Sequence, residues 1–321
     1  MAEGGSLTFR DPDAYVAAFG DICLTLTIAG AGDFTAQLTR LKLQNVDIYW
    51  CRESVPRIAF ISLPNARTVF TFPLGSVPQI ICGLAFRSGD VVFHGHGERV
   101  HQRFGSDGQW GLISFSDSQF AYISGALTGR PIASPPTSRV FKPAREASLR
   151  FDRLFRKARR FAEVGNELIA RQEVVRAMEE EVLHTVVQCI TDDQESAPAA
   201  QANHRAAIMV RFEDALSKQI DRNVNIAGLC TEIGVSERTL RMCCAQILGL
   251  SPLRYVLLRR LNRVRAALGH ADPSTTSVSE IARMNQFVEL GRFAANYRAV
   301  FGELPSSTLQ RQPGKGGCVQ S

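Results

Sequence analysis

The chain has 321 residues, of which 45% are hydrophobic and 21% are charged, so it can bury a substantial core and is long enough for two or more domains. No apolar run is long enough to cross a bilayer, and the N-terminus lacks the pattern of a signal peptide, so we expect a cytoplasmic protein. None of the eight cysteines forms a C-x-x-C pair, which favours reduced cysteines over zinc or disulfide use.

Residues 1–143 predict a β-rich domain. Short apolar or alternating runs such as RIAFISLP, TVFTFPL and QIICGLAF are separated by glycine, proline, asparagine and aspartate. Many short strands at this spacing are typical of a β-sandwich or barrel.

One group of metal-like residues lies in this domain, at His94, His96, Glu98 and His101. Imidazoles two positions apart lie on one face of a strand and could share a metal ion. The glycines between them favour the alternative, a turn in which the histidines are hydrogen-bonded. We therefore expect no metal and no cofactor.

Residues 144–191 predict helices, because apolar residues recur at helical spacing among dense charges. This segment suits dimerisation or contact between domains. The polar, alanine- and proline-rich residues 192–204 predict a flexible linker. A second domain then spans 205–311, and residues 312–321 are expected to be a disordered tail.

The segment NIAGLCTEIGVSERTLRMCCAQILG predicts two short helices with a sharp turn between them. Gly234 supplies the left-handed residue that the turn requires, since glycine has no Cβ to clash there. Ser236 is placed to cap the second helix, and Leu240 and Cys243 would pack inward. This is a helix-turn-helix pattern, whose second helix enters a major groove.

The same pattern recurs after 52 residues. Cys230 matches Ala282, and after one extra residue the offset becomes 53, so that Gly249 matches Gly302. A single helix-turn-helix pattern is a weak signal, whereas two copies with matched endings are a strong one. Between them, PLRYVLLRRLNRVRAALG predicts one helix of about five turns that sets the distance between the two reading heads.

The positive charge is concentrated in this region. Residues 204–311 contain 15 basic and 9 acidic side chains, whereas residues 1–141 contain 11 of each. A basic domain suits a polyanion partner, although a solvated basic face gives the same count.

Residues 208–311 resemble the AraC/XylS family of bacterial transcription regulators, through both helix-turn-helix segments and the helix between them. The resemblance implies a sequence-specific, double-stranded promoter or operator DNA-binding protein and not an enzyme, more often an activator, with RNA polymerase as a partner. By residue, it implies DNA contacts from the first recognition helix by Ser236, Glu237, Arg238, Arg241 and Met242, and from the second by Leu290, Arg292, Ala295, Asn296 and Arg298. Ser236 and Arg298 are expected to contact the phosphate backbone.

Two departures from the family pattern affect the second head. Asn285-Gln286 stands where the family has an apolar residue and glycine, and Leu309 replaces a tyrosine. Because asparagine tolerates a positive φ best, we expect the turn to shift by one residue, to Asn285.

The N-terminal half resembles, less specifically, the jelly-roll sensor domains of such regulators; residues 89–103 are similar to a second cupin motif. The expected fold is therefore α+β and multidomain: a jelly-roll-like β-sandwich, middle helices, and an all-α domain of two helix-turn-helix units joined by a long helix. The resemblance also allows a homodimer and a small-molecule effector. The alternatives are a cupin-type metalloenzyme or metal sensor fused to a DNA-binding domain, and an architectural protein that binds DNA without sequence preference.

Overall fold

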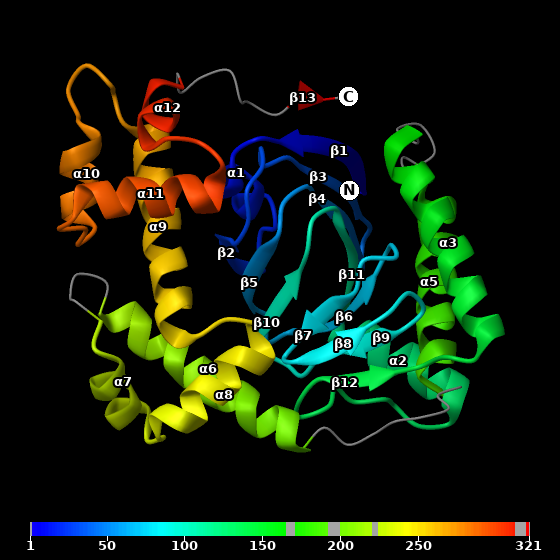
Figure 1. Cartoon of the computed structure of the whole chain (residues 1–321). Helices are drawn as coiled ribbons and strands as arrows, with labels where there is room; N and C mark the ends of the chain where they lie inside the picture. The colour runs from blue at the N-terminus through cyan, green and yellow to red at the C-terminus, as the bar shows by residue number, and fades with distance from the viewer. Residues whose placement is uncertain (1, 165–170, 192–199, 220–223, 312–318, 321) are drawn as a thin grey trace.

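A computed structural model describes residues 2–164, 171–191, 200–219, 224–311 and 319–320. It shows the expected α+β architecture, with a β-sandwich between the middle helices α3 and α5 on one side and the C-terminal helices on the other (Figure 1). Within the described residues, no helix is both long and apolar enough to cross a membrane.

The β-sandwich consists of two antiparallel sheets. The larger has the order β12-β9-β6-β11-β4-β3-β1-β13 and the smaller the order β2-β5-β10-β7-β8. The strands are β1 (Glu3–Phe9), β2 (Cys23–Ile28), β3 (Ala36–Lys42), β4 (Val46–Glu53), β5 (Arg57–Ser62), β6 (Arg67–Pro73), β7 (Gln79–Ile81), β8 (Leu84–Phe86), β9 (Val91–Phe93), β10 (Arg99–Phe104), β11 (Gly108–Ser116), β12 (Arg139–Phe141) and β13 (Val319–Gln320).

A polar cluster lies inside the sandwich. The Arg57 Nε donates to Glu53 Oε2 at 2.7 Å, and both side chains are fully buried. The Tyr15 hydroxyl and the Trp110 indole also donate to Glu53, at 2.9 and 2.8 Å. The buried charges are therefore paired and hydrogen-bonded, as burial in a low-dielectric interior requires.

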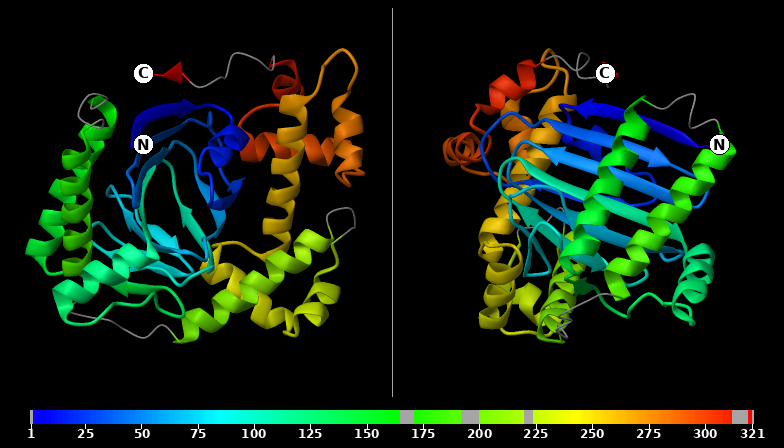
Figure 2. Two further views of the ribbon diagram at one scale, coloured as in Figure 1. Left: turned by 180° about the vertical axis from the view of Figure 1, so that it is seen from behind. Right: turned by 90° about the vertical axis from the view of Figure 1, so that its right-hand side faces the viewer.

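The middle helices cover the outer face of the larger sheet, as Figure 2 shows. Helices α3 (Arg145–Val164) and α5 (Gln172–Thr191) pack together there, and α2 (Asp117–Thr128) packs against α5. Helix α1 (Pro12–Ala17) packs against β1, β2 and β3.

The C-terminal helices form two three-helix units, whose helices follow one another in the same order and at similar sequence spacing. The first is α6 (Ala200–Lys218), α7 (Ile226–Ile233) and α8 (Glu237–Ile247); the second is α9 (Pro252–His270), α10 (Val278–Met284) and α11 (Leu290–Phe301). Helix α12 (Pro305–Gln310) follows.

Helices α6 and α9 each have 19 residues, and α9 begins 52 residues after α6. Three buried positions match at this offset: Met209 with Leu261, Phe212 with Val264 and Leu216 with Leu268. The repeat therefore begins one helix earlier than the helix-turn-helix segments. The long helix α9 both joins the two units, as expected, and supplies the first helix of the second.

The structure differs from the expected linker and tail at their ends. Residues 192–199 and 312–318 lie outside the described residues. Residues 200–204 belong to α6, where alanine and glutamine favour a helix and Asn203 donates to the Thr137 hydroxyl at 2.8 Å. Val319–Gln320 pair with β1, an edge strand that would otherwise leave backbone groups unpaired.

The smaller sheet docks on the helical domain through polar side chains. Glu213 on α6 accepts hydrogen bonds from His101 of β10 (2.9 Å), from Tyr255 (2.6 Å) and from Arg259 of α9. Asn262 of α9 pairs with both backbone groups of Ile28, the last residue of β2, at 2.9 and 3.0 Å. The β-sandwich thus contacts both three-helix units.

Glu213 makes this docking dependent on pH. Burial alone would raise the pKa of Glu213, but the hydrogen bond from His101 and the charge of Arg259 lower it below the ordinary value of 4.5. The charged carboxylate therefore stabilises the docked state above pH 4.5, and the contribution is lost as the pH falls through the lower, folded-state pKa.

We expect Glu213→Gln to be less stable than the wild type near neutral pH, by roughly 3–5 kcal/mol, because Arg259 loses its buried partner. The difference should shrink as the pH falls from 4.5 through the lower folded-state pKa, below which the wild-type carboxyl group is neutral, as glutamine is at every pH. Thermal unfolding at several pH values measures this. Glu232→Gln, which removes a more exposed carboxylate paired with Lys218, is the control. A difference that does not change with pH would contradict the role of the charge.

Candidate nucleic-acid interface

The first helix-turn-helix has the geometry that its sequence predicts. Helix α7 ends at Gly234, which takes a left-handed conformation with φ of 70°. The amide of Val235 then donates to the Cys230 carbonyl at 3.0 Å, which closes the turn. The Ser236 hydroxyl accepts from the Thr239 amide at 3.1 Å and so caps α8. These local interactions fix where the first recognition helix begins.

The second helix-turn-helix forms the same turn without glycine. The residue with positive φ is Gln286, at 67°, whereas Asn285 has φ of −95°. The expected shift of the turn to Asn285 is therefore wrong. The Asn285 side chain donates to the Ile281 carbonyl at 2.9 Å, which keeps Asn285 in the last turn of α10.

Gln286 is stabilised in this conformation by Arg260 of α9. The guanidinium of Arg260 donates to the Asn285 carbonyl at 2.9 and 3.2 Å and also to the Gln286 carbonyl. A left-handed conformation costs a non-glycine residue about 1–2 kcal/mol. Hydrogen bonds from a charged donor contribute about 1.5–3 kcal/mol, so they can offset this cost.

The candidate DNA-contacting residues lie on the two recognition helices α8 and α11. Most of them are exposed, and three are partly buried: Glu237, Leu290 and Asn296. The exposed ones are Ser236, Arg238, Arg241, Met242, Arg292, Ala295 and Arg298. Each recognition helix therefore presents candidate residues that a partner can reach from the surface.

The charges of the two helices are arranged differently. Arg241 pairs with Glu237 at 2.8 Å, one turn earlier on α8. Within the described residues, Arg238, Arg292 and Arg298 form no ion pair. Since exposed pairs such as Arg241–Glu237 contribute little, an anion can compete for Arg241 as well.

Both recognition helices end against the β-sandwich. Arg103 of β10 donates to the carbonyl of Ile247, the last residue of α8, at 3.1 Å. Gly302, the residue after α11, lies against Ala31 in the loop after β2. A Cβ placed on Gly302 would be 3.5 Å from the Cβ of Ala31. Most of the candidate residues lie in the N-terminal parts of α8 and α11, before these contacts in the sequence.

The structure does not bring the three histidines together. His94 contacts Thr71 and Ser138, each at 2.7 Å. His96 contacts Asp117 at 3.1 Å, and His101 contacts Glu213. Burial lowers the pKa of His94 to about 4, so its ring is neutral near pH 7. In the part of the chain that the structure describes, no group of three or more potential ligands has the spacing of a metal site.

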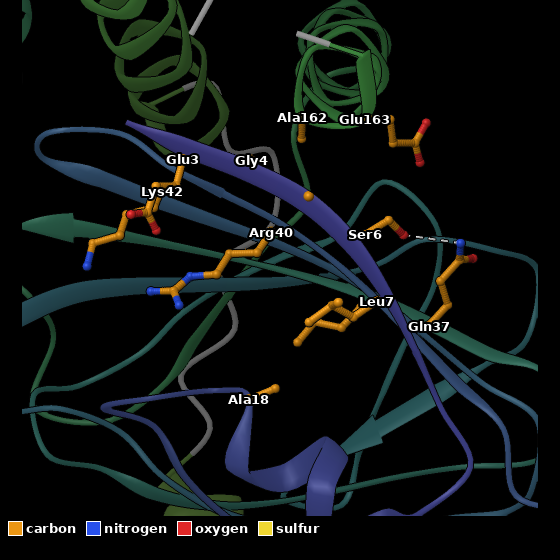
Figure 3. A pocket seen from close by; sticks show the side chains of 12 residues that line it. Glu3, Gly4, Ser6, Leu7, Ala18, Gln37, Arg40, Lys42, Ala162 and Glu163 are labelled. Carbon is orange, nitrogen blue, oxygen red and sulfur yellow. Dashed lines mark hydrogen bonds between the residues drawn. The ribbon is translucent and has the colours of Figure 1, made fainter. Parts of the chain in front are cut away.

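An open cavity of about 720 Å³ lies beside β1 and β3, with Ala162 and Glu163 of α3 on its other side (Figure 3). Arg40 and Lys42 line it. The Nε of Arg40 is buried and has no hydrogen-bond partner among the described residues. The guanidinium carbon lies 5.3 Å from the centre of the Tyr49 ring.

No sequence pattern pointed to Glu213 or Arg260. Both lie on helices outside the two helix-turn-helix segments, where side chains reach residues far away in the sequence. Extending the repeat backwards by the same offset of 52 would have identified α6 as the counterpart of α9. It would not have shown which carbonyl groups or carboxylates these side chains contact.

Comparison with known proteins agrees with this geometry. Residues 229–311 match the family model described as a helix-turn-helix domain. The XylDLEGF operon transcriptional activator 2 of Pseudomonas putida is 34% identical over 111 residues, which are 35% of this chain and 69% of that protein. The XylDLEGF operon transcriptional activator of the same organism is 36% identical over 101 residues, 32% of each chain. The chain thus spans about a third of the length of the latter.

The crystal structure of the AraC-like transcriptional activator CuxR aligns with 81% of this chain and 94% of its own, at 16% identity and a TM-score of 0.43. The paired helix-turn-helix units and the matching family model define the class of the protein, one with a double helix-turn-helix domain. Within that class, the chain belongs to the AraC/XylS family.

Proposed function

We propose that this protein is a sequence-specific activator of transcription that binds promoter DNA in the cytoplasm through both recognition helices. The observation that carries the proposal is the repeat of one three-helix scaffold, each copy presenting an exposed helix with arginines. Arginine forms paired hydrogen bonds to guanine edges and also binds phosphates. The name of the related XylDLEGF operon activator supports the sign of regulation.

The candidate residues divide into two roles. We assign Arg241 on α8 to base contacts, together with Arg238 and Met242, and we assign Arg292 and Asn296 on α11 to the same role. Arg298, near the end of α11, is assigned to the phosphate backbone. Base contacts determine sequence preference, whereas phosphate contacts contribute affinity for any sequence.

The N-terminal domain would supply sensing and assembly. A small molecule that enters the cavity beside Arg40 and Lys42 would contact β1, β3 and α3 together. Pairing of two chains through the surface of α3 and α5 would give a homodimer, and RNA polymerase is the partner that an activator requires at a promoter.

We expect Arg241→Ala to cost about 1–3 kcal/mol on the preferred site and to relax the preference at one base position. Arg298→Ala should weaken binding to all sequences about equally and reduce the salt dependence by about one counterion. The measurement is a titration of the full chain with the preferred duplex, obtained by selection from a random pool, and with unrelated duplexes at several salt concentrations. Equal effects of both variants on both kinds of duplex would contradict the division of roles.

The spacing of the two heads gives a separate prediction. Because α9 is a continuous helix, the heads should enter the major groove on one side of the duplex, about 10–10.5 base pairs apart. Inserting five base pairs between the subsites turns one of them to the opposite side, so specific binding should fall to the non-specific level. Inserting ten should not restore it, since α9 cannot lengthen. Footprinting on the three duplexes measures this; full affinity with the five-pair insertion would show that one head alone reads DNA.

A further inference from the structure

The two turns before the recognition helices have the same backbone but different residues. Gly234 and Gln286 are 52 residues apart and have φ of 70° and 67°. In the second turn the Phe287 amide donates to the Ala282 carbonyl at 3.0 Å. In the first turn the Val235 amide donates in the same way to the Cys230 carbonyl, also at 3.0 Å. Since a Cβ disfavours this conformation, the second turn needs an interaction that the first does not.

That interaction comes from one side chain, Arg260. Its guanidinium donates to the carbonyls of Asn285 and Gln286, and its central carbon lies 4.4 Å from the centre of the Phe287 ring. Three consecutive residues of the turn thus contact one group. Arg260 is partly buried on α9, with its head directed at the turn.

The first unit has a different side chain at this position. In the shared register of α6 and α9, Arg260 corresponds to Ile208, which is buried and has no hydrogen-bonding group. The first unit therefore combines Ile208 with Gly234, and the second combines Arg260 with Gln286. The two units therefore stabilise the same turn differently. The first unit uses a glycine, which has no Cβ, and the second uses a guanidinium that binds the carbonyl groups of the turn.

We propose that Arg260 is a positioning residue for DNA recognition by α11. It does not reach the exposed face of α11, but it fixes the backbone from which that helix begins. Phe287 then packs on Phe293 of α11, with ring centres 4.9 Å apart, and so couples the turn to the rotation of the helix. That rotation determines where Arg292 and Asn296 are presented. The proposal rests on the proposed function, in which α11 reads bases.

The test uses the full chain and a pool of random-sequence duplex DNA, from which each variant selects its preferred site. The wild type should select two subsites. Arg260→Ile, which places the residue of the first unit in the second, should select the first subsite unchanged. It should lose the second, with at least about a tenfold loss of affinity for the wild-type site.

The rescue distinguishes positioning from a general loss of stability. Gln286→Gly alone should keep both subsites, since glycine adopts the turn freely. The double variant with Arg260→Ile and Gln286→Gly reproduces the combination of the first unit and should recover the second subsite. A residue that merely stabilised the fold would affect both subsites together and would not be rescued by glycine.

Arg260→Lys is the milder variant in case Arg260→Ile does not fold. Lysine keeps the charge but lacks the planar fork that binds two carbonyls, so it should weaken the second subsite alone. If a folded Arg260 variant still selects both subsites, or if the double variant fails to recover the second, Arg260 is not a positioning residue. If the wild type itself selects one subsite, the proposed two-headed function fails first.

Discussion

The carboxylate of Glu213 joins the three parts of the molecule. It lies on α6 of the first helical unit and accepts hydrogen bonds from α9 of the second unit and from His101 of the β-sandwich. A buried charge is stabilised by its partners, so neither the β-sandwich nor α9 can move away from α6 without removing at least one hydrogen bond from Glu213. The relative positions of the two reading heads therefore depend on the β-sandwich as well as on α9.

The two helical units share a scaffold but differ in their surfaces. Their helices start at matching positions, and their buried residues correspond. The exposed arginines do not: in the shared register, Arg241 of α8 corresponds to Ala294 of α11, and Arg298 of α11 corresponds to Ala245. Packing makes most of the inward-facing residues of the two recognition helices correspond, as Leu240 with Phe293 and Ile247 with Val300, whereas the outward faces are free to differ. The proposed DNA site is accordingly asymmetric, with two unlike subsites.

The β-sandwich uses its polar side chains in two ways. Glu53 and Arg57 stabilise the interior, and the histidines connect strands, turns and the helical domain. Among the described residues of the sandwich, the Nε of Arg40 and the indole Nε1 of Trp50 are buried without a hydrogen-bond partner, and Arg40 also lines the cavity beside β1 and β3. Strand β10 is in contact with both α6 and the end of α8, because His101 contacts Glu213 and Arg103 donates to the Ile247 carbonyl.

The sequence by itself determined the class of fold, the two helix-turn-helix units and the first turn. These features depend on local rules: Gly234 permits a left-handed turn, Ser236 caps the next helix, and apolar spacing distinguishes strands from helices. Each of these rules depends on a few consecutive residues, and the repeat after 52 residues gives a second, independent occurrence of the helix-turn-helix pattern.

Only the tertiary structure decided how the second turn forms and how the domains meet. Local preference favoured Asn285 for the positive φ, but Arg260, 26 residues earlier, stabilises Gln286 in that conformation instead. In the same way, His101 meets Glu213 across 112 residues and not a metal ion beside its neighbours in sequence. A side chain contacts the groups that folding brings near to it, and local sequence patterns do not show which distant residues these are.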